Sequence, residues 1–292
     1  MRRPTRVLTT ALALLGFLGA SCGSTDSDSA ATTPITVAAT AAPTTDAPTT
    51  DVPTAVAATD AHTTAPAVTG DITVFAAASL TAAFTEIGDA FMVENPAAKV
   101  TFNFAASSEL VTQIGEGAPA DVFASADLSN MTKLTDAGKN ASEPVVFATN
   151  LAEIIVGAGN PKGITGVADL ANPGLIVVVC APEVPCGKYA ATIFKNAGVT
   201  VTPKSLEENV KAVVAKVTLG EADAGIVYKT DVRAAGDKAE GVEIPADINV
   251  VAQYPIAVTK EAANAEGAQA FIDFVNSEQG QKILTSYGFL VP

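Results

Sequence analysis

Two serines, Ser79 and Ser107, stand at successive junctions between an apolar, strand-like segment and a segment with helical periodicity. A serine at such a junction is first of all a helix N-cap, because its side-chain oxygen accepts a hydrogen bond from a free N–H of the first turn. Successive strand-to-helix junctions also lie at the carboxyl-end edge of one sheet, where ligands tend to bind. A helix N-terminus carries about half a positive charge and free N–H groups. The two serines therefore predict a pocket of hydroxyls and amides that suits an anion.

Three positions in the second half of the body extend this pattern. Cys186 lies where a strand leads into a helix, so its amide is at another helix N-terminus. Glu207 to Asn209 open a further helix, and the amide of Val210 falls in its first turn. Tyr228 ends an apolar strand, from which its hydroxyl can point into the same cleft. A tyrosine half-buried at a strand end is the ordinary alternative.

The segments that position these residues alternate between apolar runs and 3.6-residue periodicity from Asp71 to Pro292, a pattern typical of an α/β fold. No repeat of 20 to 50 residues is visible, so we expect two similar α/β lobes rather than a repeat array. The expected strands are residues 72–78, 100–104, 121–124, 151–158, 175–180, 224–228 and 250–258. The expected helices follow Ser79 and Ser107 and include residues 127–137, 189–196, 206–219 and two within 262–287.

The first 21 residues predict a signal peptide. Three arginines precede an apolar run from Val7 to Ala20, and small residues follow it. This run is too short for a membrane-spanning helix, which needs about 20 apolar residues. The segment Leu18–Cys22 resembles the lipobox of bacterial lipoproteins, although Gly19 stands where that motif usually has leucine. Cys22 is therefore expected to be acylated, with ordinary secretion as the alternative.

Residues 22–70 are predicted to form a disordered tether. From Gly23 to Gly70 the chain consists mainly of Thr, Ala, Pro, Ser and Asp, without lysine, arginine, phenylalanine or tyrosine. Such a segment buries too little apolar surface to offset its ordering entropy. We expect it to act as a spacer between the membrane anchor and the folded body.

Composition excludes several classes of function. The 292-residue chain has 17 Lys+Arg against 31 Asp+Glu, a net charge of −14, so nucleic acid is not an expected partner. The single histidine, His62, lies in the tether, which removes most histidine-based catalytic and zinc sites. A hydrolase or transferase with Ser79 or Ser107 as nucleophile would lack a base, because neither serine has a Ser-x-x-Lys motif. A cell-wall interaction protein, in which the tether is the functional part, remains a further alternative.

Three other sequence patterns give only weak evidence for a functional site. The glycine-containing segment 157–163 lacks dinucleotide-fingerprint spacing, and Pro161 interrupts it. Glu207 and Glu208 are adjacent and would point in different directions on a helix, so they are expected to complement its dipole rather than to form a catalytic pair. The aspartates of the first lobe do not have the spacing of a calcium-binding loop.

Five separated segments of the body form a further pattern: Phe75–Leu80, Phe104–Ser108, Gly117–Phe123, Gly225–Tyr228 and Tyr287–Phe289. Together they resemble the periplasmic molybdate-binding proteins of ABC transporters. The similarity runs in order from Asp71 to Phe289, so it covers the whole body and none of the tether.

The resemblance implies a type II solute-binding fold with a ligand cleft between two lobes, each a mixed sheet flanked by helices. Lobe 1 would comprise residues 71–152 and 255–292, and lobe 2 residues 153–254. The ligand would be molybdate or tungstate, held by neutral donors and without a cofactor or further metal. The implied ligand residues are Ser79, Ser107, Cys186, Val210 and Tyr228.

The same resemblance implies a monomeric binding protein rather than an enzyme. It would deliver its ligand to the permease and ATPase of an ABC importer, and the expected lipid on Cys22 would anchor it on the extracytoplasmic face of the membrane. A general oxyanion receptor of the sulfate-binding type is the alternative. Relatives often carry alanine at the position of Cys186, and Cys180 has no counterpart in the family pattern.

Once Cys22 carries lipid, Cys180 and Cys186 are the remaining cysteines of an exported protein. An oxidising compartment favours a disulfide between them. The bond would close a short loop and hold the Cys186 amide in place before the anion arrives. Two unpaired, buried cysteines are the alternative.

Overall fold

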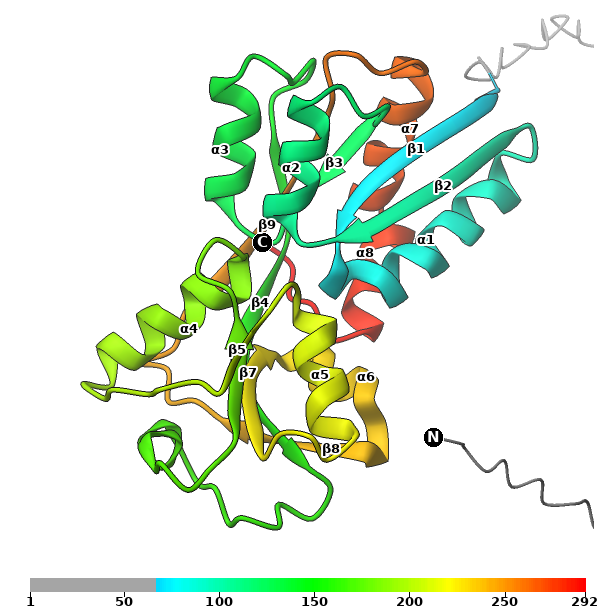
Figure 1. Ribbon diagram of the computed structural model, residues 1–292. Coiled ribbons are helices and arrows are strands. Elements are labelled where there is room, and N and C mark those ends of the chain that lie inside the picture. The colour runs from blue at the N-terminus through cyan, green and yellow to red at the C-terminus, as the bar shows by residue number, and fades with distance from the viewer. Residues whose placement is uncertain (1–66) are drawn as a thin grey trace, which may run out of the picture. The chain divides into compact units, whose positions relative to one another are not determined.

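The computed structural model describes residues 67–292 (Figure 1). The predicted signal peptide at 1–21, the lipid on Cys22 and the tether as far as residue 66 lie outside the described residues. The first strand begins at Gly70, one residue before the predicted start of the body. No helix within 67–292 is long and apolar enough to cross a membrane.

One half of the body is built on a mixed set of strands. Strand β1 lies between β2 and β3 and is parallel to both, and β9 pairs with the other side of β3 in the antiparallel direction. These strands are β1 (Gly70–Ala77), β2 (Ala98–Ala105), β3 (Val122–Ala124) and β9 (Val251–Val258). The carboxyl ends of β1 and β2 therefore meet at one edge, as the sequence predicts.

The other half has a second set of strands around β5, which is parallel to both β6 and β7. Its strands are β5 (Val177–Cys180), β6 (Ser205–Glu207), β7 (Ala224–Tyr228) and β8 (Ala239–Glu243). The carboxyl ends of β5 and β7 again lie at one edge, and Cys180 and Tyr228 occupy these ends.

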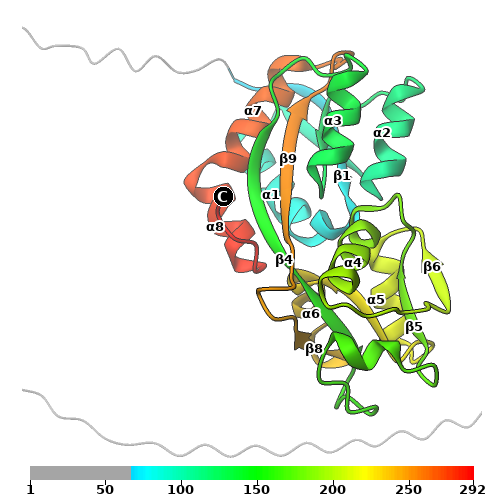
Figure 2. The same ribbon diagram turned by 90° about the vertical axis from the view of Figure 1, so that its left-hand side faces the viewer.

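Strand β4 (Val145–Gly157) connects the two halves. Its residues 145–151 pair with β9, whereas residues 152–157 pair with β7 and β8, all antiparallel. Figure 2 shows β4 and β9 side by side as the chain passes between the halves. The result is one continuous nine-stranded sheet with two lobes, so the predicted α/β fold is correct.

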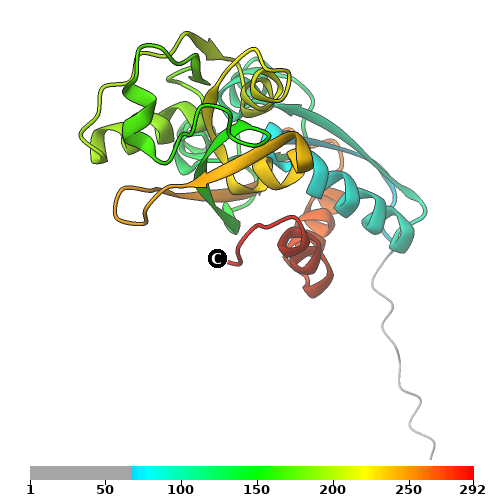
Figure 3. The same cartoon turned by 90° about the horizontal axis from the view of Figure 1, so that it is seen from below.

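Eight α-helices of the described chain flank these strands. In lobe 1 they are α1 (Thr81–Glu94), α2 (Ser107–Gly115), α3 (Leu128–Asp136), α7 (Ala265–Asn276) and α8 (Glu278–Ser286). In lobe 2 they are α4 (Pro185–Asn196), α5 (Val210–Thr218) and α6 (Lys229–Ala235). The last helices of the chain lie beside α1 (Figure 3), where Phe271 packs edge-on against Phe84 and Phe91. These buried rings join the two ends of the body.

Several element boundaries differ from the sequence-based expectation. Helix α5 begins at Val210 rather than 206, because Ser205–Glu207 forms the short strand β6 beside β5. Glu207 therefore does not start a helix, and its carboxylate pairs with Lys216 at 2.6 Å. Strand β8 and helix α6 are short, and their sequences give little periodicity from which to predict them.

Candidate functional site

The five residues singled out in the sequence line one small cavity between the lobes, of about 200 Å³ including the solvent at its mouth. Lobe 1 supplies its wall from the ends of β1 and β2 and the turns that follow them. Lobe 2 supplies the first turns of α4 and α5 and the end of β7. The residues that line the cavity are Ala77, Ala78, Ser79, Ala105, Ala106, Ser107, Ala126, Val184, Pro185, Cys186, Asn209, Val210 and Tyr228.

Ser79 lies in a short 3-10 turn, Ala78–Leu80, between β1 and α1. Its side chain is buried, and its Oγ lies 3.1 Å from the hydroxyl of Tyr254 on β9. The expected N-cap role of Ser79 is wrong, because Leu80 is the N-cap residue of α1 and no side chain caps this helix. The extra 3-10 turn moves the helix start beyond Ser79 and leaves its hydroxyl beside the cavity.

Ser107 is the first residue of α2 rather than its cap, so the capping expectation is wrong here too. The N-cap position falls on Ala106, which has extended backbone angles, and no side chain caps the helix. Ser107 is already helical, and its Oγ instead accepts a hydrogen bond from the N–H of Ala126 at 3.0 Å. This bond leaves the hydroxyl proton of Ser107 free to be donated.

Cys186 and Val210 place backbone amides at the cavity. Helix α4 begins with Pro185, which suits the first helical position because its missing N–H would have no partner there. Helix α5 begins at Val210 after Asn209, whose side chain accepts from the N–H of Ala212 at 3.1 Å. The amides of Cys186 and Val210 belong to the first turns, where N–H groups lack an acceptor within the helix.

The loop that leads into α4 is held tightly. A disulfide joins Cys180, at the end of β5, to Cys186. Directly after Cys186 the chain approaches itself so closely that a Cβ at Gly187 would lie 2.0 Å from the carbonyl oxygen of Ala181. Only glycine fits this position. The bond and the close approach both fix the first turn of α4 relative to the sheet.

Tyr228 provides the most informative atom of the site. Its side chain is only 2% exposed, and its hydroxyl is buried without a hydrogen-bond partner in the described part of the chain. A buried polar group without a partner costs about 1–3 kcal/mol, so native proteins rarely retain one without a reason. Burial, together with the nearby Tyr254, raises the pKa of Tyr228 well above 10. The hydroxyl therefore keeps its proton and can donate it.

The cavity is uncharged. Within residues 67–292, none of the side chains that line it is ionisable as an acid or base near neutral pH. Hydroxyl groups and the N-terminal ends of α2, α4 and α5 converge on the cavity. Such ends attract negative charge through their free N–H groups and dipoles. The arrangement can hold an anion through neutral donors.

Three further residues belong to the site that the sequence patterns do not identify. Lys188 on α4 donates to Asp127, the N-cap of α3, at 2.8 Å, and the hydroxyl of Tyr189 donates to the carbonyl of Ala126 at 3.1 Å. Both contacts connect lobe 2 to lobe 1 beside the cavity. The third residue is Tyr254, which contacts Ser79. No local pattern marks these residues, because their partners are distant in the chain.

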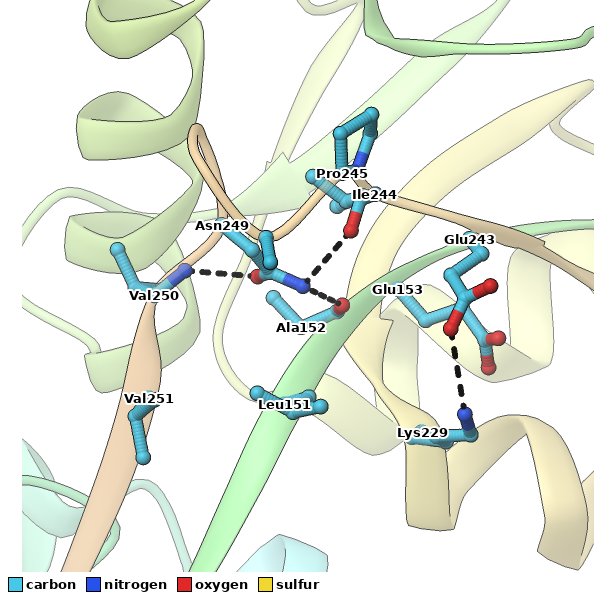
Figure 4. Close-up of a pocket in the computed structure, with 11 residues that line it drawn as sticks. Leu151, Ala152, Glu153, Lys229, Glu243, Ile244, Pro245, Asn249, Val250 and Val251 are labelled. Carbon is cyan, nitrogen blue, oxygen red and sulfur yellow. Dashed lines mark hydrogen bonds and ion pairs between the residues drawn. The ribbon is translucent and has the colours of Figure 1, made fainter.

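A second and larger cavity, of about 920 Å³ including the solvent at its mouth, lies beside β4 and β8 (Figure 4). Glu153, Lys229 and Glu243 line it, and Lys229 lies 3.7 Å from the carboxylate of Glu243. Burial raises the pKa of Glu153, and the nearby Glu243 raises it further, whereas Lys229 lowers it. Two neighbouring carboxylates disfavour an anion, so the smaller cavity fits the predicted ligand better.

Comparison with known proteins agrees with this architecture. A family described as bacterial extracellular solute-binding protein matches residues 72–290. The chain is 47% identical over 221 residues to the molybdate-binding protein ModA of Mycobacterium tuberculosis, covering 76% of this chain and 85% of that protein. It is 35% identical over 232 residues to ModA of Escherichia coli, covering 76% and 90% of the two chains.

Solved structures show the same fold. The substrate-binding domain of a putative molybdenum ABC transporter from Clostridium difficile is 30% identical, with a TM-score of 0.59 over 76% of this chain and 99% of that one. The periplasmic molybdate-binding protein of Azotobacter vinelandii is 20% identical, with a TM-score of 0.66 over 76% and 99% of the chains. This second likeness shows the fold alone.

The chain belongs to the family of bacterial extracellular solute-binding proteins. Within that family its relatives include the ModA proteins, at 47% and 35% identity, so the predicted resemblance to molybdate-binding proteins of ABC transporters is confirmed. The relatives named here are binding proteins.

Proposed function

We propose that this protein captures molybdate or tungstate outside the cytoplasm and delivers it to an ABC importer. The observation that carries the proposal is the buried hydroxyl of Tyr228, which has no partner in the described chain and lines a cavity of neutral donors. A bound oxyanion would accept this hydrogen bond and remove the cost of the unpaired group. The names of the relatives at 47% and 35% identity support the choice of molybdate.

The proposed ligand contacts come from both lobes. Ser79 and Ser107 would donate from their hydroxyls and amides, Cys186 and Val210 from their amides, and Tyr228 from its hydroxyl. Because every contact is a donor, a tetrahedral dianion would satisfy them all without any lysine or arginine. Binding between the lobes would also favour the closed arrangement over an open one.

Size would separate molybdate and tungstate from sulfate, since all three are tetrahedral dianions near neutral pH. Donors fixed on two lobes can all reach a large oxyanion, whereas a smaller one would leave some of them unpaired at about 1–3 kcal/mol each. Hydrogenphosphate would fail for another reason, because a site of donors offers no acceptor to its remaining proton. A receptor that binds sulfate equally well is the alternative.

We further propose lipid attachment at Cys22, a spacer over residues 22–70, and a monomeric body with lobe 1 at 71–152 and 255–292 and lobe 2 at 153–254. Strand pairing supports a lobe boundary near residue 152, because β4 pairs with β9 before this residue and with β7 and β8 after it. A binding role is favoured over catalysis by Ser79 or Ser107, since no side chain lining the cavity within 67–292 is a suitable base.

Ligand-dependent thermal stabilisation of the mature chain tests the proposal. A ligand that binds only the folded state stabilises it by RT ln(1 + [L]/Kd). Molybdate and tungstate should raise the melting temperature in proportion to the logarithm of their concentration, and sulfate and phosphate should do so far less. No stabilisation by any of the four anions would reject the proposal, and equal stabilisation by sulfate would favour the general receptor.

A further inference from the structure

Tyr254 lies directly behind the cavity and contacts one of its serines. It is fully buried on β9, its hydroxyl lies 3.1 Å from Ser79 Oγ, and it does not line the cavity itself. Edge-on contacts fix its ring, with centroid distances of 5.9 Å to Tyr228, 6.3 Å to Phe147 and 5.3 Å to Phe289. The position of the Tyr254 hydroxyl is therefore set by packing rather than by a ligand.

A serine hydroxyl has one proton to donate and two lone pairs that accept. At Ser107 the N–H of Ala126 already donates to the oxygen, at 3.0 Å, so the remaining proton is directed elsewhere. A backbone N–H cannot accept, so this pairing has one possible direction. Ser107 is thereby committed to donate into the cavity.

At Ser79 the partner is another hydroxyl, and the bond can run in either direction. If Ser79 donates to Tyr254, its lone pairs face the cavity. If Tyr254 donates to Ser79, the serine proton is free for an anion. The neighbouring Asn150 also lies near the Tyr254 hydroxyl and lowers its pKa, while its Nδ2 donates to Thr230 at 2.8 Å and its Oδ1 accepts from the N–H of Leu151 at 2.9 Å. A bound oxyanion accepts hydrogen bonds and cannot donate them, so with the anion present the Ser79 proton points toward it and Ser79 Oγ accepts from Tyr254.

We propose that Tyr254 is a positioning residue that donates its proton to Ser79 Oγ and so commits the Ser79 hydroxyl to donate to the bound anion. This inference rests on the proposed function. Tyr254 would orient the Ser79 hydroxyl in the same way as the N–H of Ala126 orients the Ser107 hydroxyl. With both serines committed, the cavity offers only donors and selects an oxyanion that carries no proton.

Tyr254→Phe tests this role, because it removes the hydroxyl and keeps the ring in its packing. The molybdate Kd should rise roughly 2- to 12-fold, the loss expected for one hydrogen bond. More specifically, Ser79 would become free to accept from the proton of hydrogenphosphate. The ratio of the phosphate Kd to the molybdate Kd, with phosphate measured by competition against molybdate, should fall roughly 5-fold or more.

Two variants serve as comparisons. Tyr287→Phe removes an exposed phenol hydroxyl that hydrogen-bonds Glu86 at 2.7 Å, and it should change neither constant. Ser79→Ala removes the hydroxyl that Tyr254 orients, so adding Tyr254→Phe to it should leave the phosphate-to-molybdate ratio unchanged. If Tyr254→Phe leaves the ratio unchanged in the otherwise native chain, the role is packing and the inference is wrong.

A crystal structure of the native protein with molybdate provides a second measurement that does not depend on any variant folding. Ser79 Oγ should lie within hydrogen-bond distance of both the anion and the Tyr254 hydroxyl. A Ser79 rotamer that abandons Tyr254 would overturn the inference while leaving the proposed function intact. If the native protein binds no molybdate, the proposed function fails, and the inference fails with it.

Discussion

The ammonium group of Lys188 lies 2.8 Å from the carboxylate of Asp127, and this ion pair joins the two lobes. Lys188 belongs to the first turns of α4, close to the Cys186 amide, whereas Asp127 caps α3 of the opposite lobe. Lys188 also donates to Ser129 Oγ at 2.5 Å, and its neighbour Tyr189 donates to the carbonyl of Ala126. These contacts stabilise the arrangement in which the cavity is enclosed from both sides.

Lys188→Gln should therefore speed the release of a bound anion. The side chain of Asp127 is almost fully buried and that of Lys188 is about one-third exposed, so the pair should contribute about 1 kcal/mol to the closed state after solvent screening. We expect the molybdate dissociation rate to rise roughly 5-fold in stopped-flow measurements. Lys139→Gln is the matched control, because its 2.8 Å ion pair with Glu261 lies within lobe 1. Equal rates in both variants would contradict a role in closure.

Tyr228→Phe should weaken molybdate binding without weakening the fold. The hydroxyl would donate one charge-assisted hydrogen bond to the anion, a contribution of about 1.5–3 kcal/mol, or roughly 10- to over 100-fold in Kd. Because that hydroxyl has no partner in the described chain, its removal should leave the ligand-free protein equally stable or more stable. Calorimetric titration and thermal unfolding measure the two effects. An unchanged Kd would place Tyr228 outside the site.

Replacement of both Cys180 and Cys186 by alanine should lower stability and affinity together. The disulfide closes a short loop, for which the chain-entropy model gives about 2 kcal/mol. The same loop holds the Cys186 amide at the cavity, so we expect the molybdate Kd to rise as well. Chemical unfolding and titration test both parts. Mass spectrometry that finds two free thiols in the non-reduced native protein would contradict the presence of the bond.

Alkaline pH should destabilise the fold through its tyrosines. Burial raises the pKa of Tyr189, Tyr228 and Tyr254, and the hydrogen bond to Glu86 raises that of Tyr287. The unfolded chain loses these protons near pH 10, whereas the folded chain keeps them, so stability is full below pH 10 and falls as the pH rises above it. The chain has no tryptophan, so absorbance at 295 nm reports phenolate directly. Ionisation near pH 10 in the folded protein would contradict the burial.

The sequence predicts the cavity well because local patterns mark it. Ser79, Ser107, Cys186 and Val210 all lie at helix starts, and Tyr228 ends an apolar strand, so the strand and helix patterns place them at sheet edges. The capping role predicted for the two serines is nevertheless wrong, since the N-cap of each helix lies one residue away from the serine.

Contacts between distant segments could not be predicted in the same way. The Ser79–Tyr254 hydrogen bond spans 175 residues and the Lys188–Asp127 pair spans 61 residues. Neither contact produces a periodic pattern in the sequence. The sequence predicts a helix start where strand β6 lies, because three residues are too few to show alternation, and only the pairing with β5 defines the strand.

A crystal structure of the protein grown with molybdate, with the anomalous scattering of molybdenum recorded, tests the central claim most directly. We predict one strong anomalous peak in the cavity between the lobes. The oxygen atoms around it should lie within hydrogen-bond distance of Ser79, Ser107 and Tyr228 and of the amides of Cys186 and Val210. A peak beside Glu153 and Lys229 instead, or an empty cavity at saturating molybdate, would contradict this account of the site.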